Sequence, residues 1–274
     1  MKTEILIVTF KRDFPYLRYC LESIAKFARG FEVTIVIPRQ DSERLDDLVK
    51  TWPDMPKVIV RLGDEWPDNP MLWHEWVIMN ADQWCNDADY IAHIDADCIF
   101  TQTVTPETYI REGKPIVRWE KFETIGARMP PALEWKRVTA LCLPKSWNLV
   151  ETMRCHPLVY HRSTYKLARD AITANTGVEA GSYIRSCKGT FPQGFCEFVT
   201  LGNVALNAEP EKYSPVELKT DRVVPPNHVI QFWSHGPLNL WQDIWEGGKQ
   251  HRVIPINVIA RVLGISEPKS SGLR

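Results

Sequence analysis

Apolar and polar positions follow two alternating patterns along the first hundred residues. Short runs rich in β-branched residues predict four strands, at Glu4–Thr9, Glu32–Ile37, Lys57–Leu62 and Tyr90–Ile94. Between these runs, apolar residues recur at helical spacing from Pro15 to Gly30, around Leu45 and Leu48, and from Trp73 to Trp84. Strands joined by helices of this length predict right-handed crossovers, and therefore an α/β fold with a mostly parallel central sheet flanked by helices.

The pattern is looser beyond residue 100. It predicts strands at Pro115–Glu120 and His228–Trp233, and helices at Ser163–Thr176 and Cys196–Asn207. We find no internal repeat and no clear linker. The chain is therefore expected to form a single domain with a βαβ half over residues 1–102, a second half over 103–265 and a flexible tail over 266–274.

Composition narrows the class of protein. The 274 residues carry a formal net charge of −1, from 33 basic and 34 acidic side chains, which argues mildly against an extended face for nucleic-acid binding. The apolar run Ile5–Val8 is too short for a signal peptide, and no run approaches the roughly 18 apolar residues of a membrane span. The seven cysteines are scattered and contain no Cys-x-x-Cys pair. We therefore expect a cytoplasmic protein with reduced thiols.

An Asp-x-Asp pair follows the fourth predicted strand, at Asp95 and Asp97. A second copy, Asp87 and Asp89, precedes that strand, where carboxylates solvate a turn. Position distinguishes the two copies, because open α/β sheets bind ligands at the carboxyl ends of their strands. Carboxylates at that edge suit Mg²⁺ or Mn²⁺, which are commonly held by one or two acidic side chains together with substrate phosphates.

These segments resemble the GT-A glycosyltransferases. The likeness lies in the opening strand, loop and helix (ILIVTFKRDFPYLRYCLESI) and in the segment Trp73–Phe100, which ends in the aspartate pair. More narrowly, the chain is similar to small glycosyltransferase-like proteins of bacteria and phages. The resemblance is good over residues 4–102 and is limited to short segments beyond them. It implies a single GT-A, Rossmann-like domain that binds a nucleotide sugar with its first half and an acceptor with its second.

The resemblance also implies roles for individual residues. Asp97 would bind Mn²⁺ or Mg²⁺ directly, and Asp95 would contact the ribose or support the metal. The loop after the first strand would frame the base and diphosphate of the donor, most commonly a UDP-sugar, through Thr9, Phe10, Lys11 and Arg12. Lys11 and Arg12 could instead be solvated loop charges. His235 lies in Ser234-His235-Gly236-Pro237-Leu238 after the last predicted strand, a segment that resembles the His-x-Gly segment of some retaining family members, and it would complete the metal site.

Glu197 is the candidate catalytic residue. It lies in the first turn of a predicted helix, just after Gly194, where inverting GT-A enzymes place the base that deprotonates the acceptor hydroxyl. The alternative is a carboxylate that merely complements the helix dipole. A retaining enzyme would need no such base, so the stereochemistry stays open.

The expected function is therefore metal-dependent transfer of a sugar from a nucleotide diphosphate to an acceptor hydroxyl. A metal-dependent phosphohydrolase and a non-catalytic nucleotide-sugar-binding protein are the alternatives. The acceptor is expected to be a saccharide. A hydroxymethylated base in phage DNA is a second option, for which the basic candidates are Arg128, Lys136, Arg137 and Lys145. Candidates for the acceptor side are Arg154, His156 and His161, and the tryptophans that could stack on a sugar or base are Trp66, Trp73, Trp119, Trp233 and Trp241.

Overall fold

A central sheet of five strands organises the computed structural model of this chain. The model describes residues 2–50, 52, 55–127, 129–188, 194–219, 221, 228–232, 242–246, 249–253 and 256–265. The strand order is β3-β2-β1-β4-β8, with β1 at Thr3–Val8, β2 at Glu32–Pro38, β3 at Ile59–Gly63, β4 at Tyr90–His93 and β8 at Leu158–His161. All pairs are parallel except β4 with β8. The predicted α/β fold with a mostly parallel central sheet is therefore confirmed.

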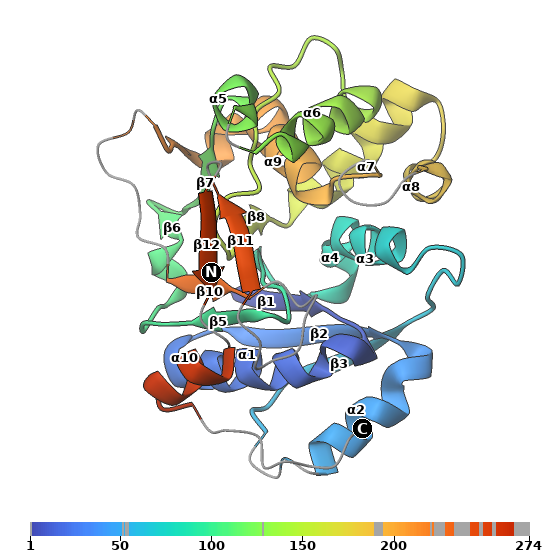
Figure 1. Cartoon of the computed structure of the whole chain (residues 1–274). Helices are drawn as coiled ribbons and strands as arrows, with labels where there is room; N and C mark the ends of the chain where they lie inside the picture. Colours follow the sequence, from blue (N-terminus) through green and yellow to red (C-terminus); the bar gives the residue numbers. More distant parts are fainter. Residues whose placement is uncertain are drawn as a thin grey trace.

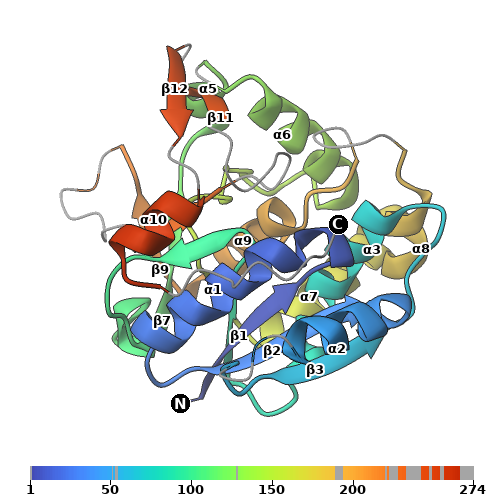
Figure 2. The ribbon, with the colours of Figure 1, turned by 60° about the horizontal axis from the view of Figure 1, so that its bottom comes forward.

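Helices cover both faces of this sheet (Figure 1). One face packs on α1 (Phe14–Phe27) and α2 (Ser42–Lys50). The other packs on α3 (Pro70–Met79), α7 (Ser163–Thr176) and α9 (Glu197–Ala208). Along β1 the side chains alternate between the two cores, with Ile5 and Ile7 in the first and Leu6 and Val8 in the second. Figure 2 shows α1 and α2 in front of the strands.

The strand order creates a switch point beside β1. The chain first runs outward from β1 to β2 and β3, and then returns to pair β4 with the other side of β1. Ligands of open α/β sheets bind where the direction of winding reverses, outside the carboxyl ends of the strands. Here those ends lead into residues 9–13 after β1 and residues 94–97 after β4.

The second half of the chain is joined to the first through strands. It supplies β8 to the main sheet, and β10 (Val229–Gln231) pairs antiparallel with β5 (Cys98–Phe100). A separate sheet contains β6 (Ile110–Arg111), β7 (Lys114–Trp119) and β9 (Ser214–Glu217), and two further strands pair with each other, β11 (Gln242–Glu246) and β12 (Lys249–Val253). Strands from residues 103–265 therefore pair directly with strands from residues 1–102.

Several helices differ from the prediction. The segment Trp73–Trp84 was expected to be one helix, but it forms α3 and α4 (Ala81–Trp84), because the helix breaks at Asn80. The side-chain amide of Asn80 donates to the carbonyl of Trp76 at 2.8 Å, which satisfies an acceptor at the end of α3. The helical elements not predicted are α5 (Phe122–Gly126), α6 (Pro131–Cys142), α8 (Ala180–Ser186), α10 (Ile256–Val262) and the 3₁₀ turns η1 (Lys11–Asp13), η2 (Arg39–Asp41), η3 (Pro106–Thr108) and η4 (Pro210–Lys212).

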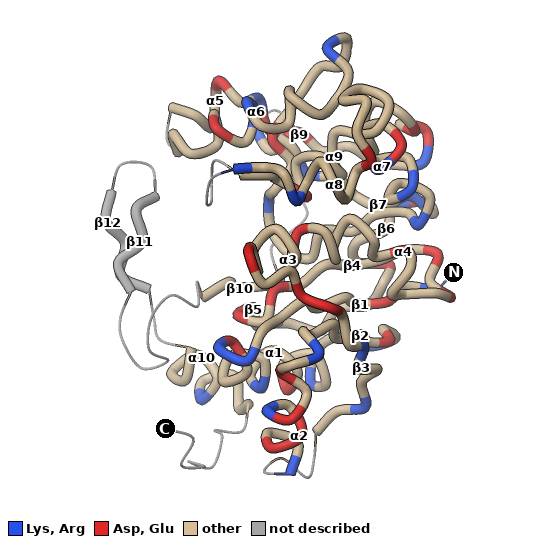
Figure 3. The backbone as a smooth tube through the Cα atoms, turned by 90° about the vertical axis from the view of Figure 1, so that its right-hand side faces the viewer, with Lys and Arg blue, Asp and Glu red and all other residues tan. Residues whose placement is uncertain are grey.

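Charges of both signs are interspersed along the chain in the view of Figure 3, and neither sign dominates there. All seven cysteines are free thiols, and five of them are buried. No helix within the described residues combines the length and the hydropathy needed to cross a membrane. The predicted tail, residues 266–274, lies outside the described part of the chain.

Candidate functional site

Asp95 and Asp97 lie in the turn between β4 and β5, at the switch point. The backbone N–H of Cys98 donates to the carbonyl of Asp95 at 3.0 Å, and that of Phe232 donates to the carbonyl of Asp97 at 2.9 Å. The pair is thus fixed where β10 meets β5. The other copy lies at the opposite end of β4, where a side-chain oxygen of Asp89 accepts from the backbone N–H of Lys2 at 2.8 Å. The two copies therefore lie at opposite ends of β4, as their order along the chain predicts.

The side chain of Asp95 accepts two hydrogen bonds on the same oxygen. Gln231 Nε2 donates to Asp95 Oδ2 at 2.8 Å, and His156 Nε2 lies 3.3 Å from that atom. The other ring nitrogen of His156, Nδ1, is 3.2 Å from the carbonyl oxygen of His93. Both partners of the ring are acceptors, and this arrangement favours the imidazolium form of His156, in which both nitrogens donate.

This ion pair controls the charge of both groups. Burial alone would raise the pKa of Asp95, but the charge of His156 and its hydrogen bond outweigh burial and lower the pKa to about 2. Burial would likewise lower the pKa of His156, but Asp95 outweighs it and the pKa is raised. Asp95 is therefore a carboxylate at neutral pH. From the sequence, His156 was predicted only as a residue that contacts the acceptor. Its contact with Asp95 was not predicted, because the two residues are 61 positions apart in the chain.

Glu197 begins α9 and is buried, with 8% of its surface exposed. Burial is the main reason that its pKa is raised, to about 7. The negative charge of Asp95 raises the pKa further, whereas the backbone N–H of Glu197 and the charge of His156 lower it. Glu197 and the Asp95–His156 pair therefore belong to one electrostatic environment, and the carboxyl group of Glu197 changes charge near neutral pH.

A second buried carboxyl group, Glu75, acts on the same region from α3. Only 3% of its surface is exposed, and its Oε2 has no hydrogen-bond partner among the described residues. Burial raises its pKa, and the charge of Glu197 raises it further, so the neutral form is favoured. The prediction missed Glu75. The available signal was a lone acidic residue in a helix that is otherwise apolar except for His74, PMLWHEWVIM.

The loop after β1 lies at the same edge of the sheet. Thr9 is buried, and its N–H donates to the carbonyl of Val36 at 3.1 Å, which extends the pairing of β1 with β2. The ring of Phe10 stacks on His74 at 6.0 Å and meets Trp73 edge-on at 5.6 Å. Trp73 is only 2% exposed, so the expectation that it could stack on a ligand is wrong: its indole belongs to the core.

The cations of this loop are exposed and lie beside acidic groups. Lys11 Nζ is 3.8 Å from Asp41 Oδ1, and the backbone N–H of Lys11 donates to Asp41 Oδ2 at 2.8 Å. Arg12 Nε is 3.4 Å from Asp13 Oδ2. Their ammonium and guanidinium groups therefore stay at the surface of the switch point, and the loop itself is tied to the start of α2 through Asp41.

The donor chemistry of the aspartate pair suits a hard divalent cation, which prefers carboxylate oxygens. Within the described residues, no group of three or more His, Cys, Asp or Glu side chains has the arrangement of a metal site. The third expected ligand, His235, lies outside the described residues, as do Trp233 and Trp241.

Comparison with models of known protein families gives no match, and comparison with curated protein sequences gives none.

Proposed function

We propose that this protein is a metal-dependent glycosyltransferase of the GT-A type, which transfers a sugar from a nucleotide diphosphate to an acceptor hydroxyl. The observation that carries the proposal is the position of Asp95 and Asp97 at the switch point of a mostly parallel sheet, in the same electrostatic environment as the buried carboxyl group of Glu197. The exposed cations Lys11 and Arg12 follow the neighbouring strand and can face the diphosphate of the donor.

The contacts of Asp95 favour different roles for Asp95 and Asp97. Asp95 Oδ2 already accepts from Gln231 and His156, so this side chain is held in one orientation and suits a supporting role or a contact with the ribose. Asp97 is then the direct ligand of Mn²⁺ or Mg²⁺. Such a cation, when bound, would neutralise the charge that builds up on the leaving diphosphate.

Glu197 is the proposed base. As the acceptor oxygen attacks the anomeric carbon, the carboxylate of Glu197 takes the hydroxyl proton, which corresponds to an inverting reaction. A base is most effective when its pKa lies near the working pH, and the pKa of Glu197 is raised to about 7. The surrounding protein excludes water from this carboxyl group, which is 8% exposed.

A saccharide acceptor is favoured over phage DNA by the state of the basic candidates. Lys136 Nζ is 2.7 Å from Glu123 Oε1, and Arg137 Nε is 2.8 Å from Glu134 Oε2. Their charges are therefore largely balanced locally, which weakens attraction to a phosphate backbone. Lys145 is exposed, and Arg128 lies outside the described residues.

The test is a panel of nucleotide sugars with and without Mn²⁺, scored by thermal shift and by release of the nucleoside diphosphate. We expect at least one nucleotide sugar to raise the melting temperature only when the metal is present, and this effect to disappear in Asp97→Ala. Asp87→Ala is the matched control, because it alters the same Asp-x-Asp pattern at the other end of β4 and is expected to behave as the unaltered protein.

Stabilisation that persists in Asp97→Ala, or in the presence of a chelator, would exclude the metal site. Release of phosphate from a diester without sugar transfer would instead indicate a phosphohydrolase. Metal-dependent binding without any transfer or hydrolysis would indicate a binding protein.

A further inference from the structure

A cavity of about 360 Å³ lies in the second half of the chain, where it is lined by residues from the end of β7, from α5 and from α6. Its walls include two half-buried indoles, Trp119 and Trp147, together with the polar side chains of Lys121, Lys136 and Asn148. This volume falls in the lower part of the range of ligand pockets, about 300–1,000 Å³. The combination of aromatic faces with a few polar groups is also that of a small-molecule site.

An antiparallel bridge between Glu120 and Glu151 joins the two segments that form the cavity wall. The N–H and carbonyl groups of Glu120 and Glu151 exchange two hydrogen bonds of 2.9 Å each. Both glutamates are buried, with 3% and 0% of their surfaces exposed. Because neighbouring residues of extended chain point to opposite sides, Trp119 and Lys121 face the cavity, whereas Glu120 between them does not line it. The two tryptophan-bearing segments are therefore held in a fixed register.

Helix α9 fixes the same wall from behind. The side-chain amide of Asn203 donates to the carbonyl of Val150 at 2.8 Å, and its oxygen accepts from the N–H of Val150 at 2.9 Å. The hydroxyl of Thr152 donates to the carbonyl of Phe198 at 3.0 Å. A rigid wall of this kind favours binding, because no loop has to be ordered when a ligand enters.

The cavity wall is close in sequence to the candidate functional site. Val150, in the cavity wall, lies six positions before His156, which contacts Asp95. Six residues of extended chain span at most about 20 Å. A saccharide of a few sugar units is therefore long enough to span the distance between this cavity and His156.

We propose that this cavity binds a sugar unit of the saccharide acceptor. Sugar rings present apolar C–H faces that suit indole rings, and hydroxyl groups that suit the amide of Asn148 and the ammonium of Lys121. Lys136 is already paired with Glu123 at 2.7 Å, so the cavity is not strongly cationic and does not favour a phosphate chain. The role as acceptor subsite rests on the proposed function, whereas the binding of a sugar does not.

The binding test uses the full chain labelled with fluorotryptophan and observed by fluorine NMR, without nucleotide. The probes are the methyl glycosides of glucose, galactose and mannose, methyl glucuronide, chitobiose, and a duplex DNA that contains hydroxymethylcytosine. Resonances are assigned with Trp119→Phe, Trp147→Phe and the control Trp84→Phe, which alters a half-buried indole of α4 outside the cavity. We expect at least one sugar to shift the resonances of Trp119 and Trp147 saturably, and that of Trp84 not at all.

Asn148 is exposed, so Asn148→Ala should keep the fold and reduce the affinity for that sugar about threefold to tenfold, the cost of one hydrogen bond. The proposal is overturned if no sugar shifts the two resonances, if only the DNA does so, or if Asn148→Ala binds the sugar as tightly as the unaltered protein. If a sugar binds but no transferase activity is found, the cavity is still a sugar-binding site and the proposed function is wrong. Transfer with an acceptor KM unchanged in Asn148→Ala would remove the acceptor role.

Discussion

Among single residues, Glu197 has the environment that matters most for the proposed chemistry. Its carboxyl group is buried at the first turn of α9, where its own backbone N–H favours the charged form while burial and Asp95 favour the neutral form. The balance leaves a pKa of about 7. A carboxyl group that only complemented the helix dipole would instead be exposed and fully charged at neutral pH.

Replacing Glu197 with glutamine tests this interpretation. Glu197→Gln removes the base but keeps the shape, so we expect transfer to fall by roughly 100-fold to 10,000-fold while nucleotide binding is retained. In the unaltered protein only the carboxylate can accept a proton. The rate should therefore fall as the pH decreases below about 7 and level off above it. Initial rates measured from pH 5 to 9 at saturating donor check both points, and full activity of Glu197→Gln would show that another group is the base.

The candidate site residues that were proposed from the sequence have local signals, whereas those that only the structure brings in depend on long-range contacts. Asp95, Asp97 and Glu197 could be predicted from local context, because a strand end and a helix start give each a position relative to the sheet. The contact between His156 and Asp95, in contrast, depends on how the segment before β8 meets the end of β4. That is a long-range pairing, and no spacing within either segment encodes it.

At the scale of elements, α9 supports both proposed sites. Its first turn carries Glu197, and its middle holds the segment from Val150 to Thr152. Gly202 permits this close contact, since a Cβ at that position would lie 2.1 Å from the hydroxyl oxygen of Thr152 and 2.4 Å from its Cβ. The glycine therefore serves a packing purpose in the interior of a helix, where it is otherwise unfavourable.

Gly202→Ala should consequently destabilise the protein although alanine is the better helix former. Overpacking of a dense core costs about 1–3 kcal/mol, whereas the change from glycine to alanine gains roughly 1 kcal/mol in helix propensity. The cost is larger than the gain if the segment from Val150 to Thr152 cannot move away from α9. The clash involves Cβ as well as the hydroxyl, so rotation of Thr152 does not relieve it. Urea unfolding checks this, with Asn207→Ala on the next turn, a half-buried residue, as the control. Unchanged stability of Gly202→Ala would show that the segment is not held tightly against α9.

Helices and strands could be predicted where their own residues carry a clear pattern, and were missed where the element depends on a distant partner. The helix predicted at Ser163–Thr176 coincides with α7, and the strands β1 to β4 lie within two residues of their predicted ends, because each has a clear period. By contrast, α6 and α8 were missed, as was the edge strand β8. The run Leu158–Tyr160 is only three residues long, and its role as a strand depends on the partner β4.

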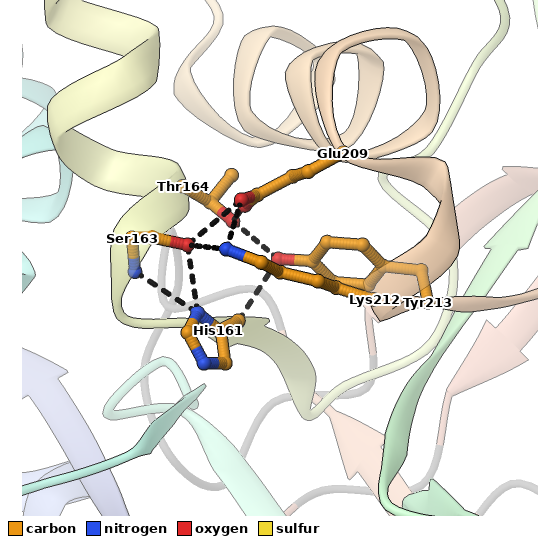
Figure 4. Close-up of polar contacts among 6 residues, drawn as sticks. All are labelled: His161, Ser163, Thr164, Glu209, Lys212 and Tyr213. Carbon is orange, nitrogen blue, oxygen red and sulfur yellow. Dashed lines mark hydrogen bonds and ion pairs between the residues drawn. The ribbon is translucent and has the colours of Figure 1, made fainter.

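At the scale of the whole molecule, shared strands join the two halves of the chain, and a polar network within the second half ties α9 and α7 to β8. Figure 4 shows Glu209, at the end of α9, reaching the start of α7. Its carboxylate accepts from Ser163 Oγ at 2.8 Å, from Lys212 Nζ at 2.7 Å and from the hydroxyl of Thr164. The phenol oxygen of Tyr213 accepts from the N–H of His161 at 2.9 Å, which links the network to β8.

The charge of Glu209 makes this connection sensitive to acid. Burial alone would raise the pKa of Glu209, but the hydrogen bonds from Lys212, Thr164 and Ser163 outweigh burial and lower the pKa below its ordinary value of 4.5. A carboxyl group whose pKa is lower in the folded than in the unfolded state stabilises the fold fully above the unfolded value. That contribution is lost as the pH falls below 4.5 and through the folded pKa.

Glu209→Gln should therefore lower the free energy of unfolding at pH 7 by about 1–3 kcal/mol, because the buried hydroxyl of Thr164 and the half-buried donors Ser163 and Lys212 lose a charged acceptor. The difference between this variant and the unaltered protein should shrink as the pH is lowered through 4.5, where the unaltered protein loses the same interaction. Urea unfolding at pH 7, 5 and 3.5 measures both effects. Glu211→Gln, an exposed position two residues away, is the matched control and should change stability little at any of these values. A constant difference across the pH range would mean that the network acts through packing and not through the charge of Glu209.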